Sequence, residues 1–325
     1  MDELQKTERK RIRNGANYAA GGLIVYDIIT MGLIAAYMLA ACFWVMAFVP
    51  GAAEDEHIFD MYTDRLMESD VISIIAVIVG TCVLALFFRG HVSKEQMVRS
   101  EKKMSVKVFL QLLCVFMMGQ LIFSIGGELL ERFLNLFGYS ALESIESASQ
   151  VSQTWSLFLY SSFVGPIVEE IIYRGFILRS FERYGKILAI LVSAILFGAM
   201  HGNLPQGLFA AGVGLVLGYT AIEYSIGWAI LLHIINNCVF SDLIGMAISG
   251  WSESAQELFY NSMFGVFTVL AVIILWRNLR EIKLFWQENR MSGRTFRYIM
   301  TSIAMIVFLA MCAAQAFVGL TPIPH

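Results

Sequence analysis

Charged residues are scarce in this chain. Only 15% of its 325 residues are Asp, Glu, Lys or Arg, whereas 58% are hydrophobic. Soluble globular proteins carry about 25% charged residues, so this composition excludes an ordinary soluble domain. The charges are also clustered, and the apolar runs between the clusters are long enough to cross a bilayer. The sequence therefore predicts an all-α polytopic membrane protein.

Other features are also missing. The cysteines form no CxxC pattern and lie in or beside apolar runs, which favours buried apolar roles: Cys42, Cys82, Cys114, Cys238 and Cys312. The chain starts with a polar, basic stretch, so no cleavable signal peptide is expected. No low-complexity segment or clear repeat stands out. The basic residues sit in short stretches beside apolar runs, where membrane topology explains them, so no nucleic-acid partner is expected.

The apolar runs predict about eight or nine transmembrane helices. The lower count applies if one of the runs is re-entrant. The expected spans are 19–49, 71–88, 108–137, 154–180, 187–201, 207–222, 227–246, 263–276 and 298–318. The fifth is short, and the glycine- and proline-containing segment 202–207 follows it. We expect this turn below the membrane surface, where irregular backbone must be buried in protein or line a wet cavity.

The loops between the spans alternate in charge. Basic residues gather in 1–18, 89–107, 179–186 and 277–297, and acidic residues gather in 50–70, 139–150 and 247–262. The positive-inside rule places the basic stretches, and with them the N-terminus, in the cytoplasm. The link 223–226 has no Lys or Arg, so its side of the membrane is the least supported part of this topology. Four regions are predicted: a cytoplasmic N-terminal segment 1–18, N-terminal spans 19–137, a membrane core 150–246, and C-terminal spans 247–325.

The stretch from Pro166 to Arg174, in the fourth span, is the most informative. A charge at bilayer depth costs about 2.5–3.5 kcal/mol, so three charges in one apolar run indicate a site. Glu170 and Arg174 are four residues apart on one helix face, which predicts an internal ion pair. Glu169 points about 100° away and is the candidate free carboxylate. Pro166 removes a backbone hydrogen bond and is expected to kink the helix, which opens space beside the carboxylates.

Two histidines lie in apolar runs. His201 ends the fifth span, and His233 lies in the seventh, where Asn237 shares its helix face and Asn236 is close beside it. Glu169 and His201 are at comparable depth, about 21–27 Å along their helices from the inner turn. His233 reaches them only if the helices are tilted or begin inside the bilayer. These residues predict a polar active-site cavity inside the helix bundle.

Such a set can hydrolyse a bond in two ways, which the residues alone leave open. Glu169, His201 and His233 could hold a divalent metal ion such as zinc, which lowers the pKa of a bound water. Alternatively, Glu169 acts as general base on a water positioned by His201, while His233 and Asn237 donate hydrogen bonds to the oxyanion. Neither route needs a serine or cysteine nucleophile. A third interpretation is that these groups only hold the helices together.

Three motifs in this order resemble those of a known family. Glu169-Glu170-xxx-Arg174, Phe197-xxx-His201 and His233-xxx-Asn237 are similar to the motifs of the CAAX-protease and bacteriocin-processing family of intramembrane metalloproteases, also called type II CAAX prenyl endopeptidase or Abi family. The resemblance covers about residues 150–245. It implies a membrane-embedded endopeptidase, often proposed to depend on metal, whose site opens toward the cytoplasm.

The resemblance also implies roles and partners. Glu169 and His201 would activate the attacking water, and His233 and Asn237 would complete the metal or oxyanion site. The expected substrate is a peptide or membrane protein in the lipid bilayer. Eukaryotic relatives trim a tripeptide after a prenylated cysteine, and prokaryotic ones are linked to bacteriocin maturation, self-immunity or signalling-protein processing. We expect a multi-pass protein of a bacterial plasma membrane; the alternative function is a non-enzymatic immunity or scaffold protein.

Overall fold

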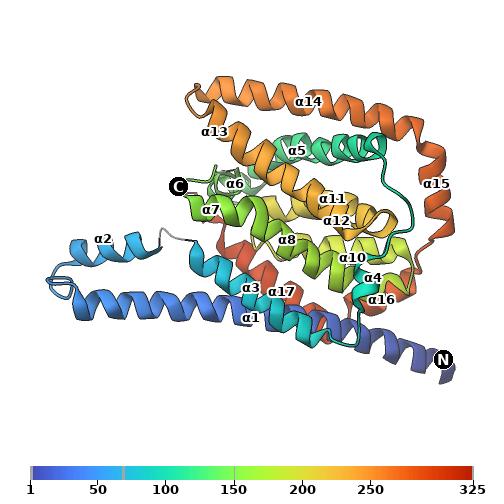
Figure 1. The fold of residues 1–325 in the computed structure, drawn as a ribbon, viewed down its shortest axis with the longest axis horizontal. Helices are drawn as coiled ribbons and strands as arrows, with labels where there is room; N and C mark the ends of the chain where they lie inside the picture. Colours follow the sequence, from blue (N-terminus) through green and yellow to red (C-terminus); the bar gives the residue numbers. More distant parts are fainter. Residues whose placement is uncertain (1–2, 68–69, 150, 324–325) are drawn as a thin grey trace.

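The computed structural model describes residues 3–67, 70–149 and 151–323, and most of them are helical (Figure 1). The strands found in these ranges are β1 (Tyr139–Ser140) and β2 (Thr321–Pro322), which pair antiparallel. Several of the helices are long and apolar enough to cross a membrane. The chain is therefore an all-α, multi-pass membrane protein, as its composition predicts.

The first helix passes through residue 18, the predicted end of the cytoplasmic segment. One helix, α1, runs unbroken from the basic segment into the first apolar run, because charged side chains such as Lys and Arg are good helix formers. The acidic loop predicted between the first two spans holds a helix, α2. The elements in this part are α1 (Glu3–Phe48), α2 (Glu56–Met67), α3 (Val71–Phe87), α4 (Lys94–Val98), α5 (Val106–Asn135) and α6 (Leu142–Ser149).

Residues 155–182 form one helical stretch that contains two π-helical turns. Pro166 lies at the start of α8, directly after the first of these turns. Because proline has no N–H, a carbonyl of the preceding turn loses its donor, and the wide turn accommodates this loss. The disturbance predicted at Pro166 is thus a π-helical turn. The elements are α7 (Trp155–Leu159), η1 (Tyr160–Val164), α8 (Gly165–Glu170), η2 (Ile171–Ile177) and α9 (Leu178–Glu182).

The next two helices, α10 and α11, pack closely side by side. A Cβ built on Gly207 would lie 2.8 Å from the carbonyl oxygen of Gly198, so the backbones approach as near as only glycine permits. The turn between them contains Gly202 at φ +57°, and Asn203 caps the following helix. The elements are α10 (Lys186–Ala199), α11 (Leu204–Glu223), α12 (Ile226–Ile234), η3 (Ile235–Leu243) and α13 (Ile244–Ile248).

The last expected span, 298–318, is broken in the structure. Helices α16 and α17 meet at an angle of 67°, because Ser302 between them is extended and ends the helical path. The preceding span is longer than predicted and starts at Glu253. The C-terminal elements are α14 (Glu253–Arg277), α15 (Leu279–Glu288), α16 (Gly293–Met300) and α17 (Ile303–Val318).

Fewer helices are long and apolar enough to be membrane spans than the eight or nine predicted. In the described part of the chain five helices are long and apolar enough, and two bent pairs, α2–α3 and α16–α17, raise the number to seven. The five are α1, α5, α11, α14 and the continuous stretch Ile226–Ile248. The stretch 155–182 is outside this set and carries several charges. Helix α10, with 14 residues, is too short to be counted as a full span.

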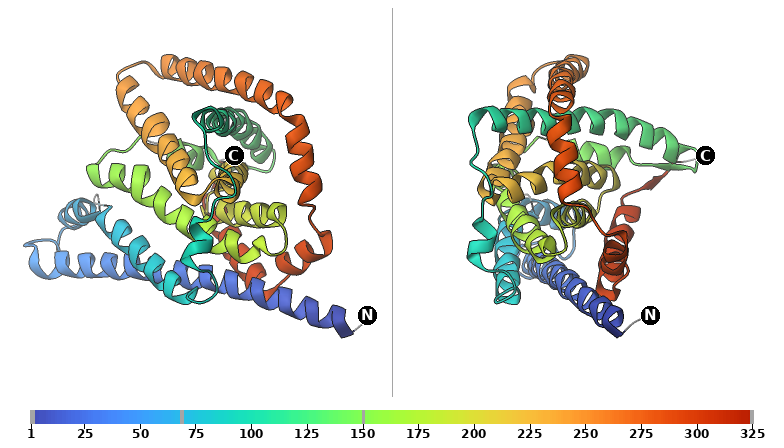
Figure 2. Two further views of the ribbon diagram at one scale, coloured as in Figure 1. Left: turned by 45° about the vertical axis from the view of Figure 1, so that its right-hand side comes forward. Right: turned by 90° about the vertical axis from the view of Figure 1, so that its right-hand side faces the viewer.

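Figures 1 and 2 show three layers of helices. Helices α1 and α3 form one edge of the molecule, and α5 and α14 form the opposite edge. The stretch 155–182 lies between them with α10, α11 and α12. Buried apolar side chains run through this middle layer, among them Ile172, Leu196 and Leu217. All three polar motifs therefore lie in the interior of the bundle.

Candidate active site

Glu170 and Arg174 form the ion pair that their spacing predicts. Glu170 Oε1 lies 3.0 Å from Arg174 Nη1, and both side chains are fully buried. The guanidinium also lies over the ring of Phe197, 4.2 Å from its centroid, and its Nη2 donates to the carbonyl of Gly214. A buried charge needs such partners because it has left water. Arg174 thus ties the central helical stretch to α10 and α11.

His233 connects the two adjacent carboxylates. Its Nδ1 lies 3.0 Å from Glu170 Oε1, and its Nε2 lies 3.8 Å from Glu169 Oε2. An ionised carboxylate only accepts hydrogen bonds, so Nδ1 carries a proton. In the neutral form of the ring, Nε2 directs its lone pair toward Glu169. His233 therefore does reach the carboxylates, and Glu170 orients an imidazole in addition to pairing with Arg174.

His201 faces the same space from just beyond the end of α10. Its Nδ1 lies 2.8 Å from the carbonyl oxygen of Phe197, which can only accept, so Nδ1 is the protonated nitrogen and Nε2 is left for other partners. The ring of Phe197 packs edge-on against His201 and His233, with centroids 5.0 and 5.9 Å away. One aromatic ring therefore sets the spacing of both imidazoles.

Asn237 supports the first π-helical turn. Its Nδ2 donates to the carbonyl of Ser161 at 2.9 Å. In a π-helix that carbonyl would accept from the residue five positions later, which is Pro166 and has no N–H. The Oδ1 of Asn237 accepts from Asn236, whose own Oδ1 accepts from Gln120 at 2.6 Å. One N–H of the Asn237 amide is thus used within the protein, and the second has no partner among the residues that the structure describes.

A cavity of about 1020 Å³ joins these groups, with Glu169, His201, His233 and Asn237 all in its wall. The side chain of Glu169 is 20% exposed, whereas that of Glu170 is 0% exposed. The separation of the two carboxylates by helical phase, predicted from the sequence, is thus confirmed. The predicted polar cavity inside the bundle is also present.

A second buried polar cluster was not anticipated. Asp242 is 2% exposed and accepts hydrogen bonds from the backbone N–H of Ser152 and the hydroxyls of Ser161 and Ser162, at 3.0, 2.9 and 2.7 Å. It anchors the start of the central stretch to η3. A carboxylate in the apolar run of the seventh span was the signal that could have revealed this cluster.

The donors Glu169, His201 and His233 are of the types that divalent ions prefer. Zinc sites need three or four such ligands at about 2.0–2.3 Å from the ion. Among the residues that the structure describes, no three His, Cys, Asp or Glu side chains are grouped closely enough to hold a metal. The arrangement places His233 between two carboxylates, Glu169 and Glu170, and the metal site stays a prediction.

Comparisons with known proteins address the same part of the chain. Residues 151–239 match the family model described as type II CAAX prenyl endopeptidase Rce1-like. A curated protein of Bacillus subtilis (strain 168), named "Putative membrane peptidase YdiL", is 31% identical over 83 residues, which are 25% of this chain and 34% of the relative. The match thus spans about a third of that relative. No solved structure matches the chain. Residues 151–239, which hold all three motifs, are therefore similar to the Rce1-like type II CAAX prenyl endopeptidases, as the motifs predict.

Proposed function

We propose that this protein is an intramembrane endopeptidase that hydrolyses a peptide bond in a membrane-associated peptide or protein. The observation that carries the proposal is the difference in surroundings between two neighbouring carboxylates. Glu170 is buried against Arg174, while Glu169 faces a large cavity 3.8 Å from His233 Nε2. The similarity to Rce1-like endopeptidases over residues 151–239 supports the same chemistry.

The gap between Glu169 and His233 suits a bound water. Two acceptors 3.8 Å apart cannot bond to each other, but a water that donates to both can bridge them. In the proposed step Glu169 takes a proton from this water while the water oxygen attacks the carbonyl carbon of the substrate. When the C–N bond breaks, the same proton passes to the leaving nitrogen.

The remaining polar groups of the site hold or complete this arrangement. His201 presents Nε2, a hydrogen-bond acceptor, to the cavity beside the water, and Glu170 fixes the ring of His233 through Nδ1. The second N–H of Asn237 is the donor available to the developing oxyanion. No step is assigned to a metal ion, because the described side chains form no three-ligand group.

The test is the substitution Glu169→Gln, which keeps the size of the side chain and removes the base. We expect cleavage to fall by about 10²–10⁴-fold, the usual contribution of a general base. The matched control is Glu128→Gln, which removes another carboxylate of the same cavity wall. Two probes are cleaved in proteoliposomes and read by mass spectrometry: a prenylated CAAX peptide and an unprenylated membrane-anchored peptide. Full cleavage by folded Glu169→Gln protein would refute the proposal, and full biological function of that variant would favour the scaffold alternative.

Elemental analysis of purified protein decides between the two hydrolytic routes. Wild-type protein is compared with Glu169→Ala and His233→Ala. A divalent ion near one equivalent in the wild type, and lost from both variants, would replace the base mechanism by a metal-bound water. Folded wild-type protein that cleaves substrate after exhaustive chelation would retain Glu169 as the base.

A further inference from the structure

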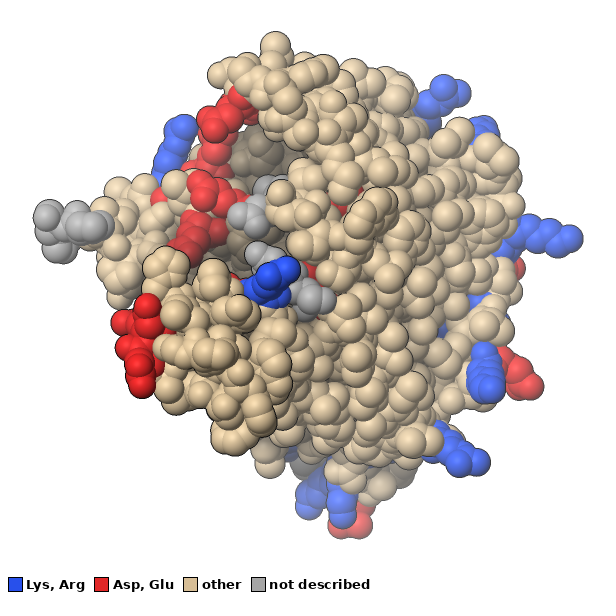
Figure 3. Space-filling view, turned by 60° about the vertical axis from the view of Figure 1, so that its left-hand side comes forward, with Lys and Arg blue, Asp and Glu red and all other residues tan. Residues whose placement is uncertain are grey.

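The two ends of the helix bundle differ in charge. We call the end formed by residues 50–67, 139–149 and 251–262 the acidic face, and the end formed by 89–107, 179–186 and 277–297 the basic face. In Figure 1 the acidic face lies to the left and the basic face to the right. Figure 3 brings the left-hand side forward and shows acidic side chains beside a hollow, with most Lys and Arg at the opposite edge.

Helix α5, helix α14 and the central stretch line the cavity with the parts that lie toward the acidic face. Helix α5 contributes lining residues between 116 and 131, and not its start beside the basic loop. Helix α14 contributes residues between 256 and 264, and not its end at Arg277. The central stretch contributes residues between 157 and 169. The cavity therefore extends from Glu169 toward the acidic face.

The charges in the cavity wall are of one sign. Five carboxylates line it, and no Lys or Arg is among the described lining residues: Asp27, Glu128, Glu131, Glu169 and Asp242. A cleft lined by one sign of charge raises the local concentration of ions of the opposite sign. An acidic peptide segment is disfavoured there, whereas a neutral or basic one is accepted.

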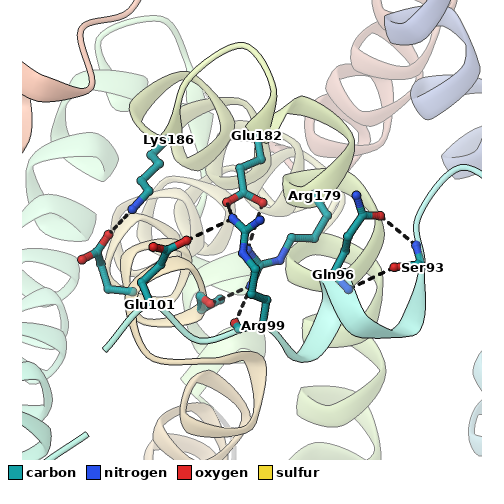
Figure 4. Close-up of polar contacts among 9 residues, drawn as sticks. Ser93, Gln96, Arg99, Glu101, Arg179, Glu182 and Lys186 are labelled. Carbon is teal, nitrogen blue, oxygen red and sulfur yellow. Dashed lines mark hydrogen bonds and ion pairs between the residues drawn. The ribbon is translucent and has the colours of Figure 1, made fainter. Parts of the chain in front are cut away.

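Ion pairs connect the segments of the basic face, and Figure 4 shows part of them. Glu182 pairs with Arg99 and Arg179, and Glu223 pairs with Lys102 and Lys186. The hydrogen bond to Glu223 raises the pKa of Lys102 above its usual value. The backbone N–H of Lys102 also donates to the carbonyl of Glu223, at 2.7 Å. The segment after α4 is thus fastened across the ends of α9 and α11.

We infer that substrates reach Glu169 from the acidic face, which the positive-inside rule places outside the cytoplasm. The inference rests on the proposed function, because only an enzyme has a substrate. It places the opening of the site on the opposite side of the membrane from the cytoplasmic opening that the family resemblance implies. The substrate class is a membrane-anchored peptide whose scissile bond lies on the extracytoplasmic side, with a neutral or basic sequence around it.

The test measures access without needing catalysis. Glu169→Cys protein is treated with a cationic, membrane-impermeant methanethiosulfonate in right-side-out and in inverted vesicles, and mass spectrometry reads residue 169 separately from the native cysteines. We expect labelling at least about tenfold faster in right-side-out vesicles, because the carboxylate-lined opening concentrates the cation. Gln120→Cys, a second cavity position, guards against misfolding of the first variant.

Two exposed positions report the orientation of the protein in the membrane. Ser147→Cys lies at the acidic mouth and Glu95→Cys on the basic face. We expect the first to react in right-side-out vesicles and the second in inverted ones. Faster labelling of Glu169→Cys and Gln120→Cys in inverted vesicles, or equal rates on both sides, would overturn the inference. So would labelling of Glu95→Cys in intact right-side-out vesicles. None of these outcomes depends on whether the protein is a peptidase.

Discussion

Two groups of ion pairs lie on the same helical stretch, one in its middle and one at its basic end. In the middle, Glu170 and Arg174 are both 0% exposed. At the end, Arg99 reaches Glu182 with 48% of its side chain exposed. Both pairs are in direct contact, but their surroundings differ. Water and salt screen the outer pair, while the inner pair is surrounded by protein.

The comparison shows that similar contacts have different consequences. Exposed pairs contribute about 0–1 kcal/mol, so the outer group fastens a loop without dominating the stability of the bundle. A buried pair adds little over an apolar replacement, but loss of one partner leaves an uncompensated charge. The inner pair also neutralises the carboxylate that orients His233, which links its integrity to the site.

The largest expected effect is on the inner pair. Arg174→Met should lower the free energy of unfolding by about 3–5 kcal/mol, because Glu170 is left buried without its cation. Thermal unfolding in detergent measures the change. The control is the double variant Glu170→Gln/Arg174→Met, which removes both charges and should recover much of the loss. Unchanged stability of Arg174→Met and of Glu170→Gln would show that the pair is not formed.

A smaller effect is expected where α10 and α11 touch. Gly207→Ala should cost about 1–3 kcal/mol, since the added Cβ would lie 2.8 Å from the carbonyl oxygen of Gly198 and force the helices apart. Gly212→Ala on the same helix is the control, because its Cβ meets no heavy atom within 4 Å. Equal stability of the two alanine variants would contradict the close packing that holds Phe197 and His201 in place.

The smallest effect is expected at the basic end. Arg99→Ala should cost less than about 1 kcal/mol, and the difference from wild type should disappear at high salt, because the pair is solvent-exposed. Unfolding in detergent at low and high ionic strength measures both quantities. If Arg99→Ala lowered the free energy of unfolding as much as Arg174→Met, and equally at low and high salt, the exposed and the buried ion pairs would not differ in the way proposed.

The parts of the site that depend on local spacing could be predicted from the sequence. Glu170 and Arg174 meet because four residues bring side chains to one helix face, and the same spacing separates Glu169 from them. The apolar runs also located most of the helices, because burial in lipid requires them. These predictions need no knowledge of how the helices pack.

The remaining features depend on contacts between distant parts of the chain. The bond between Glu170 and His233 joins residues 63 positions apart, and helical phase gave no sign of it. The cap that Asn237 provides for Ser161 depends on how η3 lies against η1. The direction in which the cavity extends follows from which half of each helix lines it. Such information appears only when the bundle is assembled.

The unbroken helix α1 has a consequence for the bilayer around the protein. Its apolar part, residues 19–48, is about 45 Å long at about 1.5 Å per residue, whereas a hydrocarbon core is about 30 Å thick. Such hydrophobic mismatch is relieved by tilt of the helix and by local thickening of the lipid. Because Tyr26 and Thr30 of α1 belong to the cavity wall, acyl-chain length becomes a determinant of the shape of the site.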